Sequence, residues 1–381
     1  MVFISNDRSV TKQQLSWALP YALQKLDGPS HDSNQTFLLD NQTGYGFGTN
    51  TNGQLGNLST VSADASSPVQ IIFGQWKQIS VGGGGTVGGI QFAAGGGMPQ
   101  KLMVWGTGGA ALAQGSNSFQ SANRSSPIFT CLGQGTWAKI AMGDSGSPSS
   151  GYAIDDSSGN GWGKLWCWGK NSYGTLGVLD TTHRSSPIVE ILNKTWIDVG
   201  AGSNHVIAID FDGKLWGWGL NIDGQVGTFE NVGTTTGISS PVQIGTGNDW
   251  MACFASSYSS FAIKSNGTLW AWGNGVAGQL ANNSGANYGS RSSPTQVGTG
   301  TDWSKIAAAN NVVYGLKTNG TLWSWGYQSN DGTQYTNAIS SPVQVAGLTN
   351  NGKYVDIKTA GAFSGVIQTY ALWNLSLIHI S

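Results

Sequence analysis

The residues that could bind a metal or act as nucleophiles are few and widely separated. No two of the four histidines stand at the spacing of a zinc motif, and the three cysteines form no Cys-x-x-Cys pair. These residues are His31, His183, His205, His379, Cys131, Cys167 and Cys253. The sequence therefore predicts no metal site and no disulfide framework.

Other segments resemble fragments of ligand-binding or catalytic motifs, but each lacks a residue that the chemistry requires. The Asp-x-Asp-Gly sequence at 210–213 has no glutamate at the twelfth position of a calcium loop, and the glycine run at 82–89 precedes no Gly-Lys-Ser/Thr. The serine within 144–146 is not in a nucleophile elbow, and the acidic residues at 155–156 and 180 have no acid–base partner. We therefore expect turns at the first two places, a packing or turn role for His205, no cofactor and no enzyme activity.

The aromatic residues follow a tandem repeat, which is the dominant feature of the chain. Its strongest copies, Leu-Trp-x-Trp-Gly, stand at Leu165–Gly169, Leu215–Gly219, Leu269–Gly273 and Leu322–Gly326. A Ser-Ser-Pro sequence closes each unit, at Pro68, Pro127, Pro187, Pro241, Pro294 and Pro342, in steps of 48 to 60 residues. Of the 17 tryptophans, all except Trp17 and Trp162 fall on repeat positions. We therefore expect them to pack between the repeats.

Each unit is expected to contain four short antiparallel strands. In the fifth unit these are 250–255, 260–264, 268–272 and 293–297, and Asn266-Gly267 predicts a two-residue hairpin turn between the second and third. One such sheet cannot bury its own faces, whereas stacked sheets can. The sequence therefore predicts an all-β fold, a β-propeller of four-stranded blades, with six blades and a partial seventh.

The repeat unit resembles that of the regulator of chromosome condensation family. The anchors are Trp-x-x-Ile, Gly-x-x-His, Leu-Trp-x-Trp-Gly, Gly-Gln-Leu-Gly and Ser-Ser-Pro, and they recur in this order. Examples are Gly53–Gly56 and Gly224–Gly227 for the fourth anchor and Gly202–His205 for the second. The resemblance covers residues 22–374 and implies the propeller fold. Function in this family depends on loops that differ between members, so the anchors themselves assign none.

The two ends of the chain are expected to lie outside complete blades. Residues 1–21 have no assigned structure, residues 22–374 form the propeller, and residues 375–381 are expected to be a non-native tail. The seventh unit stops soon after Leu372-Trp373, which predicts an open or gapped ring in a truncated fragment.

The charge content excludes several classes of partner. Charged residues make up 10% of the chain against about 25% in an average domain, and the net charge is −1. A direct nucleic-acid partner is not expected, because no basic patch is present. No apolar run reaches the roughly 20 residues of a membrane span, and no signal peptide is seen. The low charge and abundant Gly, Ser, Thr and Asn resemble bacterial surface or phage particle proteins, which suggests that location.

The sequence favours a non-enzymatic binding or structural scaffold that presents loops to a macromolecular partner, a protein or a surface glycan. Two alternatives stay open: guanine nucleotide exchange on a small GTPase, and adhesion as a surface or phage tail module. Ultraviolet sensing is disfavoured, since the Gly-Trp-Arg-His-Thr motif of the plant photoreceptor is missing. The loops after Trp-Gly vary most in length, and we expect their aromatic residues to contact the partner: Phe119, Tyr173, Phe229 and Tyr288.

Overall fold

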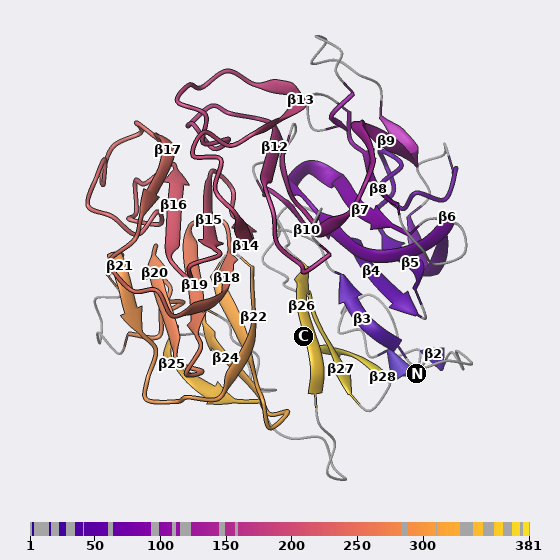
Figure 1. Cartoon of the computed structure of the whole chain (residues 1–381). Coiled ribbons are helices and arrows are strands. Elements are labelled where there is room, and N and C mark those ends of the chain that lie inside the picture. Colours follow the sequence, from indigo (N-terminus) through magenta and orange to yellow (C-terminus); the bar gives the residue numbers. More distant parts are fainter. Residues whose placement is uncertain are drawn as a thin grey trace.

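The protein is an all-β propeller whose sheets surround a central axis (Figure 1). The computed structural model describes residues 2–3, 15–16, 23–27, 35–40, 42–59, 64–92, 99–108, 112–114, 123–144, 149–156, 159–282, 289–309, 311–327, 338–345, 354–360, 368–373 and 376–380. In these parts of the chain, no helix has the length and apolar character needed to cross a membrane.

Four consecutive repeats each form a separate four-stranded antiparallel blade, with the strands in chain order. The first contains β10 (Trp137–Met142), β11 (Ser150–Asp155), β12 (Leu165–Gly169) and β13 (Arg184–Val189). The second contains β14 (Trp196–Ala201), β15 (His205–Asp210), β16 (Leu215–Gly219) and β17 (Ile238–Gln243). The third contains β18 (Trp250–Ala255), β19 (Ser259–Lys264), β20 (Leu269–Gly273) and β21 (Arg291–Gln296). The fourth contains β22 (Trp303–Ala309), β23 (Val312–Lys317), β24 (Leu322–Gly326) and β25 (Ile339–Gln344). First strands contact the first strands of neighbouring blades, which places them nearest the axis.

The first two repeats share one seven-stranded sheet. Its strands are β3 (Leu23–Asp27), β4 (Gln35–Asp40), β5 (Thr43–Gly48), β6 (Ala65–Val81), β7 (Thr86–Gln91), β8 (Gln100–Gly106) and β9 (Arg124–Gly135). β6 is continuous over 17 residues, and its first part pairs with β5 while its last part pairs with β7. The predicted count of six blades and a partial seventh is therefore wrong. The described residues form five blades, the seven-stranded sheet and the four four-stranded ones, because β6 joins two repeat units that we expected to form separate sheets.

The C-terminal strands meet the N-terminal ones. β26 (Tyr354–Ala360), β27 (Gln368–Trp373) and β28 (Ser376–Ile380) form a three-stranded sheet, and β1 (Val2–Phe3) pairs with β2 (Leu15–Ser16). β26 and β27 both contact β3, and the two ends lie side by side in Figure 1. The gap expected at the incomplete seventh unit is therefore not observed at this seam.

The hairpin turns have a different geometry from the one predicted. In the turn after β19, Gly267 has a φ of +78°, whereas Asn266 does not adopt a positive φ. The Gly267 amide donates to the Lys264 carbonyl at 2.8 Å, and the Lys264 amide donates to the Thr268 carbonyl at 3.0 Å. This is a three-residue hairpin in which only the glycine is left-handed. A Cβ at Gly267 would lie 2.0 Å from the Thr301 carbonyl oxygen, so glycine is required there.

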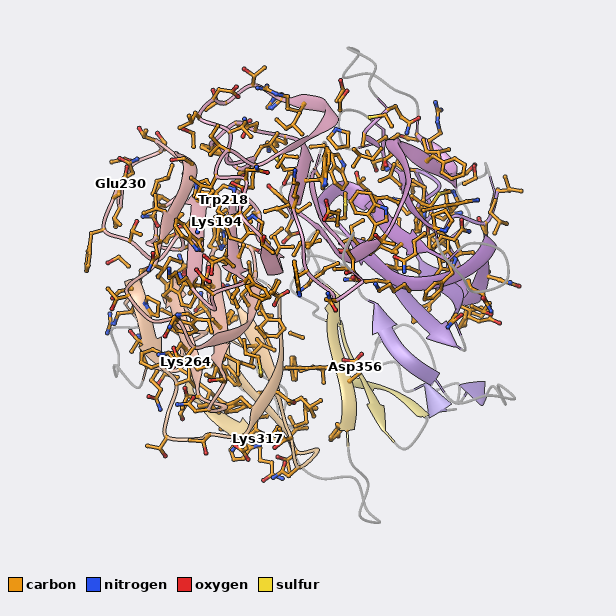
Figure 2. The ribbon with its side chains drawn as sticks, viewed as in Figure 1. Lys194, Trp218, Glu230, Lys264, Lys317 and Asp356 are labelled. Carbon is orange, nitrogen blue, oxygen red and sulfur yellow. The ribbon has the colours of Figure 1, made fainter. Side chains whose placement is uncertain are left out.

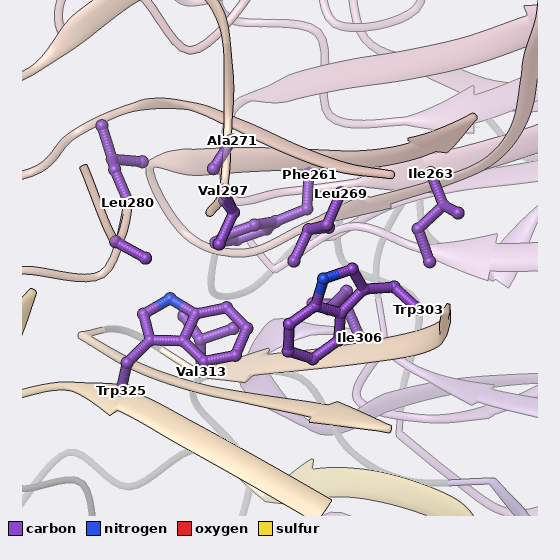
Figure 3. Close-up of a cluster of buried hydrophobic side chains, with 11 residues drawn as sticks. Phe261, Ile263, Leu269, Ala271, Leu280, Val297, Trp303, Ile306, Val313 and Trp325 are labelled. Carbon is purple, nitrogen blue, oxygen red and sulfur yellow. The ribbon is translucent and has the colours of Figure 1, made fainter. Parts of the chain in front are cut away.

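The hydrophobic core lies between neighbouring blades, as the repeat pattern predicted. One cluster combines Phe261, Leu269 and Val297 of one blade with Trp303 and Trp325 of the next (Figure 3). Seven tryptophans of the repeat have less than 2% of their surface exposed: Trp76, Trp105, Trp168, Trp196, Trp218, Trp272 and Trp325. Burial of these rings is the main apolar contribution to blade stacking.

Polar side chains near the axis link one blade to the next. They stand two residues after the first aromatic residue of a repeat, a tryptophan or, before Asp356, Tyr354, where the first strand has a β-bulge. Lys139 binds Asp198 of the following blade, and Asp198 Oδ2 accepts from the Cys253 amide at 2.9 Å in the blade after that. Lys305 binds Asp356 Oδ1 at 2.7 Å in the same way, and Figure 2 shows Asp356 on β26.

We predict that Asp356→Ala loosens β26, which its ion pair joins to β22 of the fourth blade, and so weakens the contact of β26 with β3 at which the propeller closes. Asp356 is buried, but Lys305 is 44% exposed, so screening limits the loss in unfolding free energy to about 1 kcal/mol. The sharper readout is hydrogen exchange in Leu23–Asp27, which is expected to rise by about tenfold because local opening precedes global unfolding. The control is Asp212→Ala, which removes an exposed ion pair to Lys214. Unchanged exchange in Leu23–Asp27 would show that Asp356 does not hold the seam.

Candidate functional site

One end of the propeller carries the loops that vary most between repeats. In a four-stranded antiparallel blade, the first and third connections lie at the same end. Backbone hydrogen bonds join them: the amides of Lys170, Leu220 and Asn274 donate to carbonyls of the first connection of their own blades, at 2.7 to 3.2 Å. We call this end the loop face, and we call the third connections the rim loops. They are residues 49–64, 107–123, 170–183, 220–237, 274–290 and 327–338.

A buried asparagine holds each of three rim loops in shape. The Oδ1 atoms of Asn50, Asn171 and Asn221 accept backbone amides five residues further on, at 3.0, 2.9 and 2.8 Å. The Asn221 Nδ2 donates to the carbonyls of Thr228 and Glu230. These asparagines were not predicted from the sequence. Their signal is an asparagine three residues before the first glycine of the Gly-Gln-Leu-Gly anchor.

The rim loops are also fixed to the neighbouring repeat. The tryptophan before the last glycine of the Leu-Trp-x-Trp-Gly anchor, or of its variant at 102–106, donates its indole N–H to a carbonyl in the rim loop of the preceding repeat. The pairs are Trp105 to Gln54 (2.7 Å), Trp218 to Thr175 (2.7 Å), Trp272 to Gln225 (3.0 Å) and Trp325 to Gln279 (2.8 Å). Gly174 has a φ of +72°, and a Cβ there would lie 2.4 Å from the Ser239 Cα of the next blade. The Gly-Gln-Leu-Gly anchor therefore holds its loop against the next repeat.

Polar interactions order the rim loop at 170–183. Arg184 pairs with Asp180 at 2.5 Å. Desolvation acts to raise the pKa of Asp180, but hydrogen bonds from the Thr182 amide, Arg184 and Asn171 outweigh it and lower that pKa. His183 Nδ1 accepts from the Asn171 amide at 2.8 Å, and burial, with the nearby Lys170 charge, lowers its pKa. This histidine is therefore a neutral acceptor within the loop.

The repeats match a known family. Residues 163–209, 212–263 and 266–316 each match the regulator of chromosome condensation (RCC1) repeat, and residues 196–225 match a second form of the same repeat. The chain is an RCC1-repeat protein. Prp20p from Saccharomyces cerevisiae has a similar structure, with a TM-score of 0.71, 18% identity, and coverage of 87% of this chain and 80% of Prp20p. Human WBSCR16 is also similar, with a TM-score of 0.73, 17% identity, and coverage of 94% and 89%. At these identities, the two structures support the fold alone.

Two of the four predicted contact residues, Tyr173 and Phe229, lie in the described part of the chain, and both are on the loop face. Phe229 is 79% exposed, whereas Tyr173 is half-buried. Their loops meet, because a Cβ at Gly237 would lie 2.0 Å from the Tyr173 carbonyl oxygen. Phe119 and Tyr288 lie outside the described residues.

Further exposed apolar residues on the loop face were not predicted. Their exposed fractions range from 36% to 64%, and they are Leu58, Leu179, Ile222, Val232, Tyr258, Val276 and Tyr327. The prediction from the sequence was limited to aromatic residues of four rim loops, which left out the aliphatic residues, Tyr258 in a first connection and Tyr327 in the last rim loop. An exposed leucine in a rim loop has the same local sequence signal as a buried one.

The candidate motifs for chemistry serve the fold in this RCC1-repeat protein. Among the described residues, no three His, Cys, Asp or Glu side chains are grouped to hold a metal. The sequence at 210–213 is a hairpin turn in which Asp210 Oδ1 accepts the amides of Asp212 and Lys214. Residues Gly83–Gly85 form a short 3-10 turn. Burial raises the pKa of the Cys253 thiol to about 12, and it also raises that of Cys167, so neither is a ready thiolate.

His205 has the packing role that we expected. It is 1% exposed, and its Nε2 lies 2.8 Å from Ser260 Oγ of the next blade. Ser260 Oγ in turn donates to the Gln225 carbonyl at 2.7 Å. The Gly-x-x-His anchor thus supports the base of a rim loop in its own blade.

Stability is predicted to depend on the protonation of His205. Burial lowers the pKa of its imidazole from 6.5 to about 3. Between these values the unfolded chain binds the proton and the folded chain does not, so stability is retained above pH 6.5 and falls as the pH drops toward 3. The slope is at most about 1.4 kcal/mol per pH unit.

The measurement is denaturant unfolding between pH 7 and pH 4. His205→Gln is expected to have a flatter pH profile than the wild type, even if it is less stable at pH 7. His183→Gln is the matched control, because that histidine is less buried. Parallel profiles for wild type and His205→Gln would contradict the assignment.

Proposed function

We propose that this RCC1-repeat protein is a non-enzymatic binding module whose loop face contacts a protein partner. The observation that carries the proposal is the contrast between the two parts of each repeat. The four four-stranded blades share one strand pattern and a buried core, whereas the rim loops differ in sequence, and their described parts are held by buried hydrogen bonds and expose apolar side chains. Rigid loops lose little conformational freedom on binding, which favours affinity.

Protein binding is also a property of one structural neighbour. The structure of Prp20p was described together with its binding to Gsp1p and histones. Guanine nucleotide exchange on a small GTPase remains the alternative, and the experiment includes it as an outcome.

The test compares three immobilised proteins in extracts of the organism that encodes the chain. They are the wild type, a loop-face variant with Phe119, Tyr173, Phe229 and Tyr288 changed to alanine, and a control variant, Phe211→Ala. Phe211 is 57% exposed in a second connection, at the opposite end of the blade. The wild type and the control are expected to capture the same protein in the same amount. The loop-face variant is expected to capture at least tenfold less of it, without a change in melting temperature.

Equal capture by the loop-face variant would show that the partner binds elsewhere. Capture of a small GTPase, followed by accelerated nucleotide release from it, would replace the proposal with the exchange function. Turnover of nucleotide, ester or glycoside substrates by the purified protein would contradict the non-enzymatic assignment.

A further inference from the structure

One rim loop is closed at its base by a histidine. His183 is the last residue of the loop at 170–183, directly before β13, and its Nδ1 accepts the Asn171 amide at 2.8 Å. Asn171 is fully buried, and its Nδ2 donates to the carbonyls of Asp180 and Thr182 at 2.9 and 3.1 Å. The bond to His183 therefore joins the end of the loop to the asparagine that holds the loop in shape.

The first rim loop has a carboxylate at the same position. Asp64 is the last residue before an outer strand, β6, and its Oδ1 accepts the Asn50 amide at 3.0 Å. Aspartate and histidine present this acceptor at the same place, because Oδ1 and Nδ1 are both bonded to Cγ. They differ in their response to acid: a carboxylate still accepts at mildly acidic pH, whereas an imidazole Nδ1 accepts only while it carries no proton.

Protonation of His183 places two donors against each other. Both ring nitrogens of an imidazolium carry a hydrogen, so Nδ1 can no longer accept the Asn171 amide. Asn171 is fully buried, so water reaches its amide only if the loop opens. A buried donor without a partner is unfavourable, and the open loop is therefore the better state for a protonated His183.

The charges around His183 do not favour its protonated form. Burial and the nearby Lys170 charge lower its pKa from 6.5, while Asp180 is paired with Arg184 at 2.5 Å. Elements packed against the loop also contribute carboxylates, which are Asp144 in the first connection of the same blade and Asp223 and Glu230 in the next rim loop. The closed loop thus binds the proton less readily than an open one. It is fully favoured above pH 6.5 and loses this advantage as the pH falls.

We propose that His183 is a pH-sensitive switch of the rim loop at 170–183. The neutral imidazole holds the end of the loop against Asn171, and protonation releases it. The released part contains Leu179, which is 64% exposed and whose amide donates to the Ser239 carbonyl of the next blade. The surface presented by this part of the loop face therefore changes with acidity. This regulation goes beyond the proposed function and does not depend on which partner binds.

The test follows hydrogen exchange of residues 171–183 at pH 7.5 and pH 4.5. Rates are expressed as protection factors, which remove the intrinsic pH dependence of exchange. Protection in the wild type is expected to fall about tenfold at pH 4.5, because the loop opens locally. Residues 50–59 of the first rim loop are the internal control, since Asp64 acts there. The pKa of Asp180 is lowered from 3.8, so this group does not titrate between the two conditions.

Two variants separate the acceptor from the titration. His183→Asn places an amide oxygen where Nδ1 stands and has no titratable group, so residues 171–183 are expected to stay protected at both pH values. His183→Leu has no acceptor, and its loop is expected to be about tenfold less protected at both. An unchanged melting temperature of His183→Asn at pH 7.5 shows that the fold is intact.

Three outcomes overturn the inference. Equal protection of the wild type at the two pH values would show that the loop does not respond to acid. A fall in His183→Asn as large as in the wild type would show that another group titrates. Full protection of His183→Leu at pH 7.5 would show that this bond does not close the loop. None of these measurements involves a partner, so the inference can fail while the proposed function stands, and the reverse.

Discussion

Trp272→Ala is expected to destabilise the protein by about 3–5 kcal/mol, one of the largest effects of any single substitution in the chain. The ring has no exposed surface and packs in the cluster between two blades, against Ile244 and Ile209. Its indole N–H donates to the Gln225 carbonyl at 3.0 Å, so truncation leaves a cavity and removes one of the two hydrogen bonds to that carbonyl, the other coming from Ser260 Oγ. The measurement is the midpoint of urea unfolding.

Two matched variants separate burial from the loss of any large side chain. Trp270→Ala removes a half-buried ring on the same strand, and the indole N–H of this ring donates to Thr268 Oγ1 at 3.0 Å. This variant is expected to lose less unfolding free energy than Trp272→Ala. Met251→Ala removes a side chain that is 51% exposed, and it is expected to change the midpoint little. Equal midpoints for the two tryptophan variants would contradict the assignment of Trp272 to the core between the blades.

Most of the fold could be predicted from the sequence, because each repeat carries the same residue pattern and therefore predicts the same strands. The tryptophan spacing identified the third strand of each blade and the buried faces between blades, and the structure confirms both. The number of blades could not be predicted, because strand continuity through Pro68 to Val81 depends on pairing with β5 and β7 on successive segments. No local sequence signal distinguishes that arrangement from two strands joined by a loop.

The closing of the ring was also mispredicted, for a related physical reason. The expectation of a gap rested on the repeat pattern, in which the seventh unit lacks its last anchor. The contact of β26 and β27 with β3 arises between residues more than 300 positions apart, about which the local pattern carries no information. Exposed positions in the rim loops were equally inaccessible, because a leucine in a turn is buried or exposed according to its φ and to the neighbouring blade, as at Leu179.

Asn221→Ala is expected to disorder the rim loop at 220–237 and to cost about 2–4 kcal/mol of stability. The side chain is fully buried and makes three hydrogen bonds, accepting from Val226 and donating to the carbonyls of Thr228 and Glu230. Each backbone group left without a partner in a buried site costs about 1–3 kcal/mol, although water entering the loosened loop offsets part of this.

The position of the effect is as informative as its size. Hydrogen exchange and proteolysis are expected to increase within 220–237, while β16 and β17 remain protected, because the asparagine bonds the loop and not the blade. Thr235→Ala, which changes an exposed residue of the same loop, is the control and is expected to leave both unchanged. If partner capture falls with Asn221→Ala while Phe229 is still present, then binding depends on the shape of the loop as well as on its exposed side chain. Unchanged exchange in 220–237 would show instead that the Trp272 contact with Gln225 is sufficient to hold the loop.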